Sequence, residues 1–276
     1  IKSFSTDFEI TRLLNNGWSL ELGFPISSNS RTSDLEHGGL NTPRHTTRAF
    51  GMGDLHLMAY KWLFKLTDRG NVQLGMGIKF PTGDFKKQDY FYRNDTTRVL
   101  SLVNPSIQLG DGGTSIITEL NAFYFFGQKR TINVYGNFYY LINPVDVNGT
   151  QYTQGRTPVP ALLNEGYYDV SVPDVYSLRS GLDFNFKNLT LSAGLRYEGV
   201  PVHDLFGQSN GIRRNGYTLS AEPGITYKFK KTVFYFYIPF VLSHEIKQSV
   251  LEKELDKYFT GGSGDYQIFV GAQFQL

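Results

Sequence analysis

The chain alternates apolar and polar residues along much of its length, most strictly in residues 189–198 and 217–229. Successive side chains of a β-strand point to opposite faces, so this pattern predicts strands with one apolar and one polar face. The charged residues of the two segments all fall on the polar face: Arg196, Glu198, Glu222 and Lys228. Strands of about 9–11 residues with this division are typical of β-barrels that cross a bilayer.

The same alternation predicts eleven strands, joined in turn by short turns and long loops. The expected strands are 4–12, 18–24, 54–66, 71–80, 114–126, 133–139, 176–186, 189–198, 217–229, 232–245 and 266–276. The expected turns are Asn15-Asn16-Gly17, Thr67 to Gly70, Gly127 to Arg130, Lys187-Asn188 and Lys230-Lys231. Residues 25–53 and 143–174 are expected to be long polar loops.

The strand expected at 54–66 is out of phase with this scheme. Leu55, Leu57 and Ala59 share a face with Lys61 and Lys65. A β-bulge near Tyr60 would restore an unbroken apolar face.

Bacterial single-chain barrels have an even number of strands, short periplasmic turns and long extracellular loops. We therefore expect a twelfth strand upstream of Phe4. The alternative, in which residues 99–109 form a strand of their own, would place every later short turn outside the cell. The prediction is an all-β fold, a transmembrane antiparallel up-and-down β-barrel of about 12 strands that forms a single domain over residues 1–276. An eleven-stranded sheet with an open seam would count against it.

Composition narrows the class of protein by exclusion. No apolar run approaches the roughly 18–20 residues of a membrane-spanning helix. The net charge of +2 and the lack of a basic stripe argue against a nucleic-acid partner. The start at Ile1 and the absence of Cys are those expected of a processed envelope protein. A secreted β-sandwich or lipocalin-like barrel is the soluble alternative. We expect a bacterial outer membrane location, with lipids and lipopolysaccharide as partners.

Several short motifs resemble one known family. They are residues 194–207, 212–217, 222–227, Ile238-Pro239, Gly53-Asp54-Leu55 with Lys61, Phe80-Pro81-Thr82-Gly83-Asp84 and residues 110–115. Together they resemble the outer-membrane "transporter" family named after the meta-pathway of phenol degradation. That resemblance implies a barrel that passes small apolar or aromatic compounds. The chain departs from the pattern by ending in Gln275-Leu276, and by a Lys- and Glu-rich segment at 247–257 that could form a short surface helix.

The polar face of the strands defines the candidate lumen. The lumen or constriction candidates are Glu21, Lys79, Glu119, Tyr135, Tyr139, Arg179, Asp183, Arg196, Glu198, Glu222 and Lys228, with Asp7 and Glu9 on the same face. The simpler interpretation is that these groups are cross-strand partners that satisfy one another. The sharper one is a polar constriction that sets selectivity, with Tyr135, Tyr139, Tyr235 and Tyr237 as aromatic surface for an apolar solute.

The loop at 143–174 carries an apolar cluster that should not stay in water. Its candidates for a lid over the mouth, or for contact with a protein partner, are Pro160, Leu162, Leu163, Tyr167 and Tyr168. In another loop, Arg213-Arg214 is expected either to bind a carboxylate such as Asp204 or to be a solvated turn.

Signals for catalysis or metal binding are weak. Ser243-His244-Glu245 places Ser243 and His244 on opposite faces of a strand, and no Cys or His cluster has zinc spacing. We expect no enzyme, no cofactor and no metal site. The leading function is a passive channel for small apolar or aromatic compounds. The alternative is a structural or accessory barrel subunit of an outer-membrane protein complex, with a plugged lumen and an envelope protein as its partner.

Overall fold

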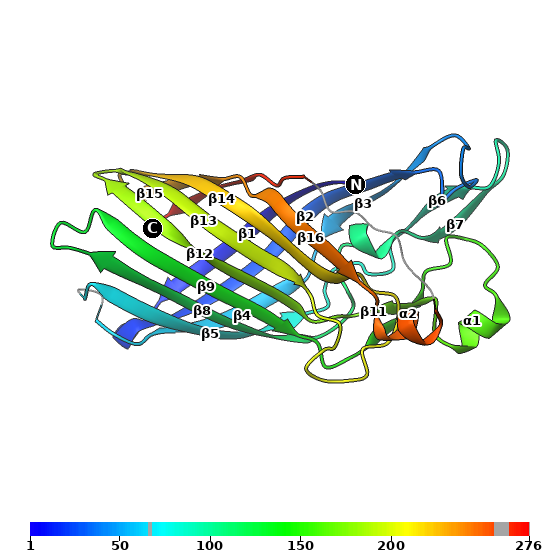
Figure 1. Cartoon of the computed structure of the whole chain (residues 1–276), viewed down its shortest axis with the longest axis horizontal. Coiled ribbons are helices and arrows are strands. Elements are labelled where there is room, and N and C mark those ends of the chain that lie inside the picture. Colours follow the sequence, from blue (N-terminus) through cyan, green and yellow to red (C-terminus); the bar gives the residue numbers. More distant parts are fainter. Residues whose placement is uncertain (66–67, 257–264, 276) are drawn as a thin grey trace.

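A single large antiparallel sheet dominates the computed structural model, which describes residues 1–65, 68–256 and 265–275. The sheet curls around an axis along the length of the molecule (Figure 1). Among the described residues, eleven strands follow one another in chain order along an unbranched path. They are β1 (Lys2–Leu13), β2 (Trp18–Ser33), β4 (Leu55–Trp62), β5 (Gly70–Phe80), β8 (Ser115–Phe126), β9 (Ile132–Ile142), β12 (Val175–Phe186), β13 (Leu189–Val200), β14 (Asn215–Phe229), β15 (Thr232–Tyr237) and β17 (Phe269–Phe274). The fold is therefore all-β, as the alternation predicted.

Two further strands extend this sheet at one end. β3 (His45–Met52) pairs with the part of β2 that lies beyond β4, and β16 (Phe240–Lys247) pairs with the part of β14 that lies beyond β15. The same end carries the hairpins β6 (Gln88–Tyr92)–β7 (Arg98–Leu102) and β10 (Val147–Gln151)–β11 (Asp169–Ser171), and the short helices η2 (Pro105–Ile107), α1 (Pro160–Asn164) and α2 (Val250–Glu254) (Figure 1). We call this the loop end, and the opposite end, with η1 (Asn15–Gly17), the turn end.

The tight turns form where the sequence predicted them. Asn16 and Gly17 have φ values of 59° and 74°, and Lys187 and Lys230 have φ values of 47° and 54°. The left-handed backbone region reverses a two-residue hairpin without splaying the strands, which is why Asn and Gly are favoured there. These turns keep consecutive strands in uninterrupted register, as between β12 and β13.

The two faces of the sheet have the reverse of a soluble protein's polarity. On β13, the apolar Leu191 and Leu195 are 40% and 49% exposed, whereas the intervening Ser192 is 6% exposed. Soluble proteins bury such leucines and leave the serines in water. The convex face of the curled sheet is thus apolar, and its concave face is polar.

Aromatic residues border the apolar convex face at both ends. At the loop end, the rings of Tyr176, Tyr197 and Tyr217 follow one another at centroid distances of 5.6 and 5.1 Å. At the turn end, Phe186 lies on the same strand as Tyr176 and is 56% exposed. The ten residue steps between these two correspond to about 33 Å along a strand. At a tilt of about 40° they span a height of about 25 Å, equal to that of the apolar band of outer-membrane barrels.

No helix among the described residues has the length and apolar content that a membrane span requires.

The long loop expected at 25–53 is wrong in its larger part. β2 continues to Ser33, and β3 pairs with it from His45 to Met52. β2 is polar on both faces beyond Ile26, as Ser27 and Ser28 illustrate. β3 mixes polar and apolar residues on each face, with Thr47 and Ala49 on one and Arg48 and Phe50 on the other. An apolar face is needed only where a strand faces lipid, so a strand that continues beyond the apolar band loses the alternation that identifies it.

The bulge expected near Tyr60 is also wrong. β4 keeps unbroken register with β2 and with β5, and Lys61 lies on the convex face. Its ammonium group donates a hydrogen bond to the Asn16 carbonyl and lies 5.3 Å from the centre of the Trp18 ring. Lysine can keep its carbon stem on an apolar surface while its charged end reaches polar groups at the turn end. Lys65 lies beyond the end of the strand.

The described residues contain no twelfth strand on the path that runs from β1 to β17. β1 begins at Lys2 and is one edge of the sheet, β17 is the other, and no pairing joins the two. The alternative strand at 99–109 is wrong as well, because residues 98–102 pair with β6 outside the main sheet. With eleven antiparallel strands, the two edges run in the same direction, and one more strand between them would be antiparallel to both. This open seam between β1 and β17 is the outcome that counts against a closed barrel of twelve strands within the described residues. Closure by a strand upstream of Phe4 stays a prediction.

Two further expectations concern the C-terminal part of the chain and the residues outside the described ranges. α2 occupies residues 250–254 within the helix expected at 247–257, and it is capped by Ser249 and Glu252. Leu251 is only 7% exposed, so this helix packs against the protein instead of lying freely on the surface. Leu66, Thr67, Lys257 and Leu276, which the sequence placed in a strand, a turn, the helix and the last strand, lie outside the described residues.

Candidate functional site

Long side chains on the concave face lie across glycines of the neighbouring strands. A Cβ added at Gly194 on β13 would overlap the phenol of Tyr135, which reaches over from β9. A Cβ added at Gly75 on β5 would lie 2.6 Å from a ring carbon of Tyr60 on β4. Glycine at these inward positions therefore lets large polar side chains lie flat against the wall, which leaves space along the axis.

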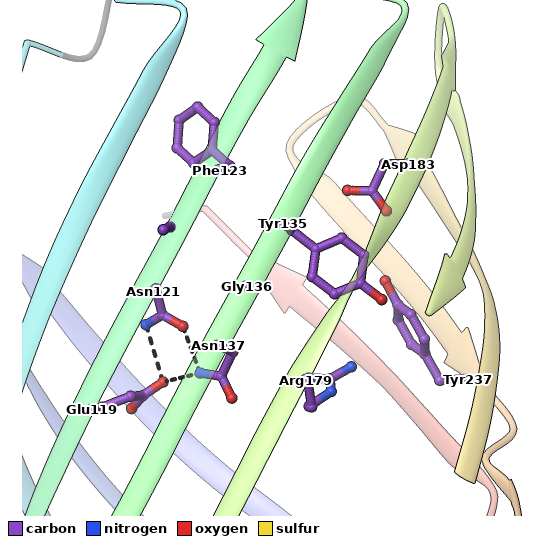
Figure 2. Close-up of a pocket in the computed structure, with 10 residues that line it drawn as sticks. Glu119, Asn121, Phe123, Tyr135, Gly136, Asn137, Arg179, Asp183 and Tyr237 are labelled. Atoms are coloured by element: carbon purple, nitrogen blue, oxygen red, sulfur yellow. Dashed lines mark hydrogen bonds between the residues drawn. The ribbon is translucent and has the colours of Figure 1, made fainter. Parts of the chain in front are cut away.

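A row of acids and amides runs along the concave face of β2, β4, β8 and β9. The Glu119 carboxylate accepts hydrogen bonds from the amides of Asn121 and Asn137, each at 3.0 Å (Figure 2). The Tyr60 hydroxyl lies 3.0 Å from Glu119 Oε2 and 3.3 Å from Glu21 Oε1. Glu21 on β2 and Glu119 on β8 are thus joined through the hydroxyl of Tyr60, although they lie on strands that are not neighbours.

A charged network faces this row from β12, β13 and β14. Glu222 is fully buried, and it accepts hydrogen bonds from Arg179 Nε at 2.8 Å and from Arg196 Nε at 2.6 Å. Arg196 also binds Glu198 at 3.0 Å. Two guanidinium groups and two carboxylates give a net charge of zero. These are the contacts expected of cross-strand partners that satisfy one another.

A cavity of about 360 Å³ lies between the two polar systems (Figure 2). Its wall includes Glu119, Asn121, Phe123, Tyr135, Asn137, Arg179, Asp183 and Tyr237. Three of these are aromatic, and the Arg179 guanidinium lies 5.5 Å from the centre of the Tyr237 ring. Rings and a few convergent polar groups around a space of this size are typical of small-molecule sites.

The remaining lumen candidates lie on the concave face away from this cavity. Lys79 is at the loop end, where it binds Asp54 at 3.3 Å and also Asp111. Tyr139 packs against an apolar cluster described below. Lys228 shares a face with Glu222 near the turn end and is exposed. Tyr237, whose orientation the sequence left open, points into the cavity.

An apolar cluster crosses the concave face nearer the loop end. Met58, Tyr60, Ile117 and Leu141 are 2%, 9%, 4% and 7% exposed and pack together. Sequence analysis did not single out this cluster. The alternation of the strand could have identified it, because Ile117 lies two residues from Glu119 and therefore on the same face of β8. The concave face is therefore polar in its middle and carries an apolar cluster nearer the loop end.

Residues 103–109 cover the concave face beyond that cluster. Val103, Ile107 and Leu109 pack on Ala49 of β3, and the Asn29 amide of β2 donates to the Ile107 carbonyl at 3.3 Å.

The lid candidates lie elsewhere at the loop end. α1 is at the outer tip of the loops, away from the strand ends (Figure 1). Pro160 is exposed, Leu162, Leu163, Tyr167 and Tyr168 are half-buried, and the two tyrosine rings meet edge to face at 5.3 Å. Their role as a lid or a partner contact stays a prediction.

Buried polar groups hold the loops together. Glu36 accepts hydrogen bonds from Arg31 at 2.8 Å and from Tyr152 at 2.6 Å, and burial beside this carboxylate raises the pKa of Tyr152. Arg213 binds Asp204 at 2.7 Å with both side chains buried, which confirms the first of the two expectations for that turn. Such pairs order a loop because separating them would leave a buried charge.

The sequence Ser243-His244-Glu245 does not assemble a catalytic pair. Ser243 pairs with Leu219 and His244 with Thr218 as successive positions of β16. No hydrogen bond joins Ser243 to His244 in the part of the chain that the structure describes. The alternation of the strand holds the two side chains on opposite faces.

Comparisons with known proteins give a likeness to solved structures and no match in sequence. No family model matches the chain, and no curated protein does. Among solved structures, the chain is similar to the one titled "NanC porin structure in rhombohedral crystal form", with a TM-score of 0.48 and 11% identity over 99% of this chain and 94% of that one. None of these findings names the meta-pathway family, so that resemblance stays a prediction. The fold and the site rest on the chain's own geometry.

Proposed function

We propose that the chain is a β-barrel of a bacterial outer membrane, with lipids and lipopolysaccharide against its convex face. The reversed polarity of the two faces supports this, because an apolar outer surface of this extent is stable only against lipid or protein. The aromatic rows at both ends of the apolar band support it as well. Short turns at one end and long loops at the other agree with an orientation that puts the loop end outside the cell.

We further propose that this barrel is a passive channel for small apolar or aromatic compounds. The observation that carries the proposal is the cavity on the concave face, where the rings of Phe123, Tyr135 and Tyr237 line the same space as the amides of Asn121 and Asn137 (Figure 2). Aromatic rings can stack on a planar solute while the amides exchange hydrogen bonds with its polar groups.

The second candidate is an accessory barrel with a plugged lumen that serves an envelope complex. The buried cluster around Met58 and Ile117 favours it, together with the segment 103–109 that covers the loop end. Both would oppose free passage along the axis. The two unpaired edges β1 and β17 add a place where a strand of a partner could bind.

Solute uptake by proteoliposomes separates the two functions. The test solutes are phenyl glucoside and cellobiose, which are of similar size, and the sugar group of each slows its passage through lipid. The perturbed variant is Gly194→Leu, whose side chain would push the Tyr135 ring into the cavity. The matched control is Ala193→Leu, which places the same leucine side chain on the convex face one residue earlier on the same strand.

The channel predicts faster uptake of phenyl glucoside than of cellobiose, reduced in Gly194→Leu and unchanged in Ala193→Leu. Equal rates for the two solutes would contradict selectivity for aromatic compounds. Uptake of neither solute by the wild-type protein would contradict the channel and favour the accessory barrel.

A further inference from the structure

We propose that Glu9, Glu21 and His56 form a binding site for a divalent transition-metal ion of the class of Zn²⁺ on the concave wall. The three residues come from β1, β2 and β4, and each can offer one ligand atom. These atoms all lie within 4.8 Å of one another. Small side-chain rotations bring such a set to the ligand separations that a tetrahedral ion with bonds of about 2.0–2.2 Å requires.

The register of three strands brings these residues together. Glu9 on β1 is paired with Gly23 on β2, and Gly23 is paired with His56 on β4. Glu21 lies two residues before Gly23, so it points to the same face. The strands on which the ligands stand are therefore joined by backbone hydrogen bonds, which holds the three positions before any ion binds.

Gly23 provides the space in which the ligands meet. A Cβ at this position would overlap the imidazole of His56 and would lie 3.2 Å from Cγ of Glu9. The imidazole therefore lies directly over the glycine, next to the Glu9 side chain. Any larger residue at position 23 would push the ring out of this place.

The electrostatics of this wall favour a cation. The charged groups that act on Glu9 are the carboxylates of Glu21, Asp7 and Glu119. Neither Glu9 nor Glu21 has an ion pair with a basic side chain among the described residues. Carboxylates this close repel one another, and a divalent ion between two of them would remove that repulsion.

The nearest lysine on the neighbouring strand is already engaged. Lys79 is paired in register with His56, but its ammonium group binds Asp54 and Asp111 instead. The uncompensated negative charge therefore stays at the Glu9–Glu21 side of the wall.

Neighbouring hydroxyl groups orient the Glu21 carboxylate. Thr11 donates a hydrogen bond to Glu21 Oε2 at 2.9 Å, and the Tyr60 hydroxyl lies 3.3 Å from Oε1. Partners of this kind fix the direction of a ligand and strengthen metal binding. Glu9 and His56 make no side-chain hydrogen bond within the described part of the chain, so both are free to coordinate.

The ligand set selects the class of ion. Imidazole suits Zn²⁺, Co²⁺ and Ni²⁺, whereas Mg²⁺ and Ca²⁺ prefer oxygen ligands alone. One imidazole and two carboxylates leave at least one coordination position for water from the lumen. The inference goes beyond the proposed channel and does not depend on passage of any solute.

The test is isothermal titration of the purified full-length protein in detergent with ZnCl₂, and then with MgCl₂. Visible absorption of bound Co²⁺ reports nitrogen ligation independently. We expect one Zn²⁺ per chain, with affinity at least about tenfold lower in His56→Ala and in Glu21→Gln, because even indirect partners of a metal contribute tenfold or more. Gly23→Ala keeps all three ligands and should lose binding to a similar degree.

The control variants are His203→Ala and Glu245→Gln, which remove one imidazole and one exposed carboxylate elsewhere and should leave Zn²⁺ affinity unchanged. Circular dichroism reports whether each variant retains its strands. If Gly23→Ala does not fold, His56→Ala and Glu21→Gln decide the question. Wild-type protein that binds no Zn²⁺, affinity unchanged in His56→Ala, or equal affinity for Mg²⁺ would each overturn the site. Zn²⁺ binding by a protein that passes no solute would contradict the channel and leave the metal site supported.

Discussion

Replacement of Glu222 by Gln tests whether the charged network holds the wall together. The glutamine amide has nearly the shape of the carboxylate, but only its oxygen can accept a hydrogen bond. One of Arg179 and Arg196 keeps an acceptor, and the other faces an N–H₂ group. The net charge of the four-residue network rises from zero to +1.

The magnitude follows from the burial of these groups. Glu222 is 0% exposed, and the side chains of Arg179 and Arg196 are 28% and 14% exposed. Removal of one member of a buried ion pair costs about 3–5 kcal/mol. Arg196 retains its bond to Glu198, so we expect a loss near the lower end, about 3 kcal/mol in the free energy of unfolding.

The assay is reversible urea unfolding of the protein in lipid vesicles, followed by tryptophan fluorescence. The control is Glu245→Gln, whose partner Lys247 is 3.8 Å away with both side chains about half exposed, and which should change stability by no more than about 1 kcal/mol. The double variant Arg179→Gln/Glu222→Gln restores neutrality and should lose less than the sum of the single changes. A loss below about 1 kcal/mol in Glu222→Gln would refute the view that these ions are desolvated partners.

Two further predictions concern the loop end. Burial, reinforced by His45, lowers the pKa of His37, whose Nδ1 accepts a hydrogen bond from the Tyr92 amide at 3.0 Å. Because folding lowers this pKa, the neutral His37 imidazole stabilises the folded state fully above the ordinary pKa of about 6.5. This stabilisation is lost as the pH falls through the pKa of the folded state. The protection factor of the Tyr92 amide, which is its exchange rate corrected for the intrinsic pH dependence, should therefore fall between pH 7.5 and 5 by more than it falls in His37→Gln, and equal changes would contradict the assignment. Ile107→Ala should destabilise the covering segment by about 2–5 kcal/mol, so that trypsin cleaves the loops faster and phenyl glucoside uptake rises. Unchanged cleavage would show that the segment is held by other contacts.

The sequence was informative where strands face lipid. Leu189 to Val200 and Val175 to Phe186 lie in strands close to their expected positions, because lipid on one side and water on the other impose a strict period of two. The same rule failed for β3, which lies beyond the apolar band, and for Lys61, whose side chain follows the apolar surface to the turn end. A hydropathy pattern depends on the surroundings of a strand. It therefore predicts a strand only where the two faces of that strand meet different environments.

The candidate site was predictable in its members and not in its connections. The alternation placed Glu119, Arg179 and Glu222 on one face of the sheet. The ion pair between Arg179 and Glu222 passes over β13 at Gly194, so it depends on the register of three strands. The Glu9–Glu21–His56 set was missed for the same reason. Its members are spread over 48 positions of the chain, and no spacing motif describes residues that only strand register unites.

The central claim is that the convex face contacts lipid and the concave face contacts water. The most direct measurement uses the absence of native cysteine to attach a bimane label at Leu191→Cys on the convex face or at Thr190→Cys on the concave face. Both variants are reconstituted in vesicles that contain brominated lipid, which quenches a fluorophore on contact. Lipid at the convex face and water at the concave face predict strong quenching at position 191 and little at position 190. Equal quenching at the two positions, or stronger quenching at position 190, would contradict this arrangement.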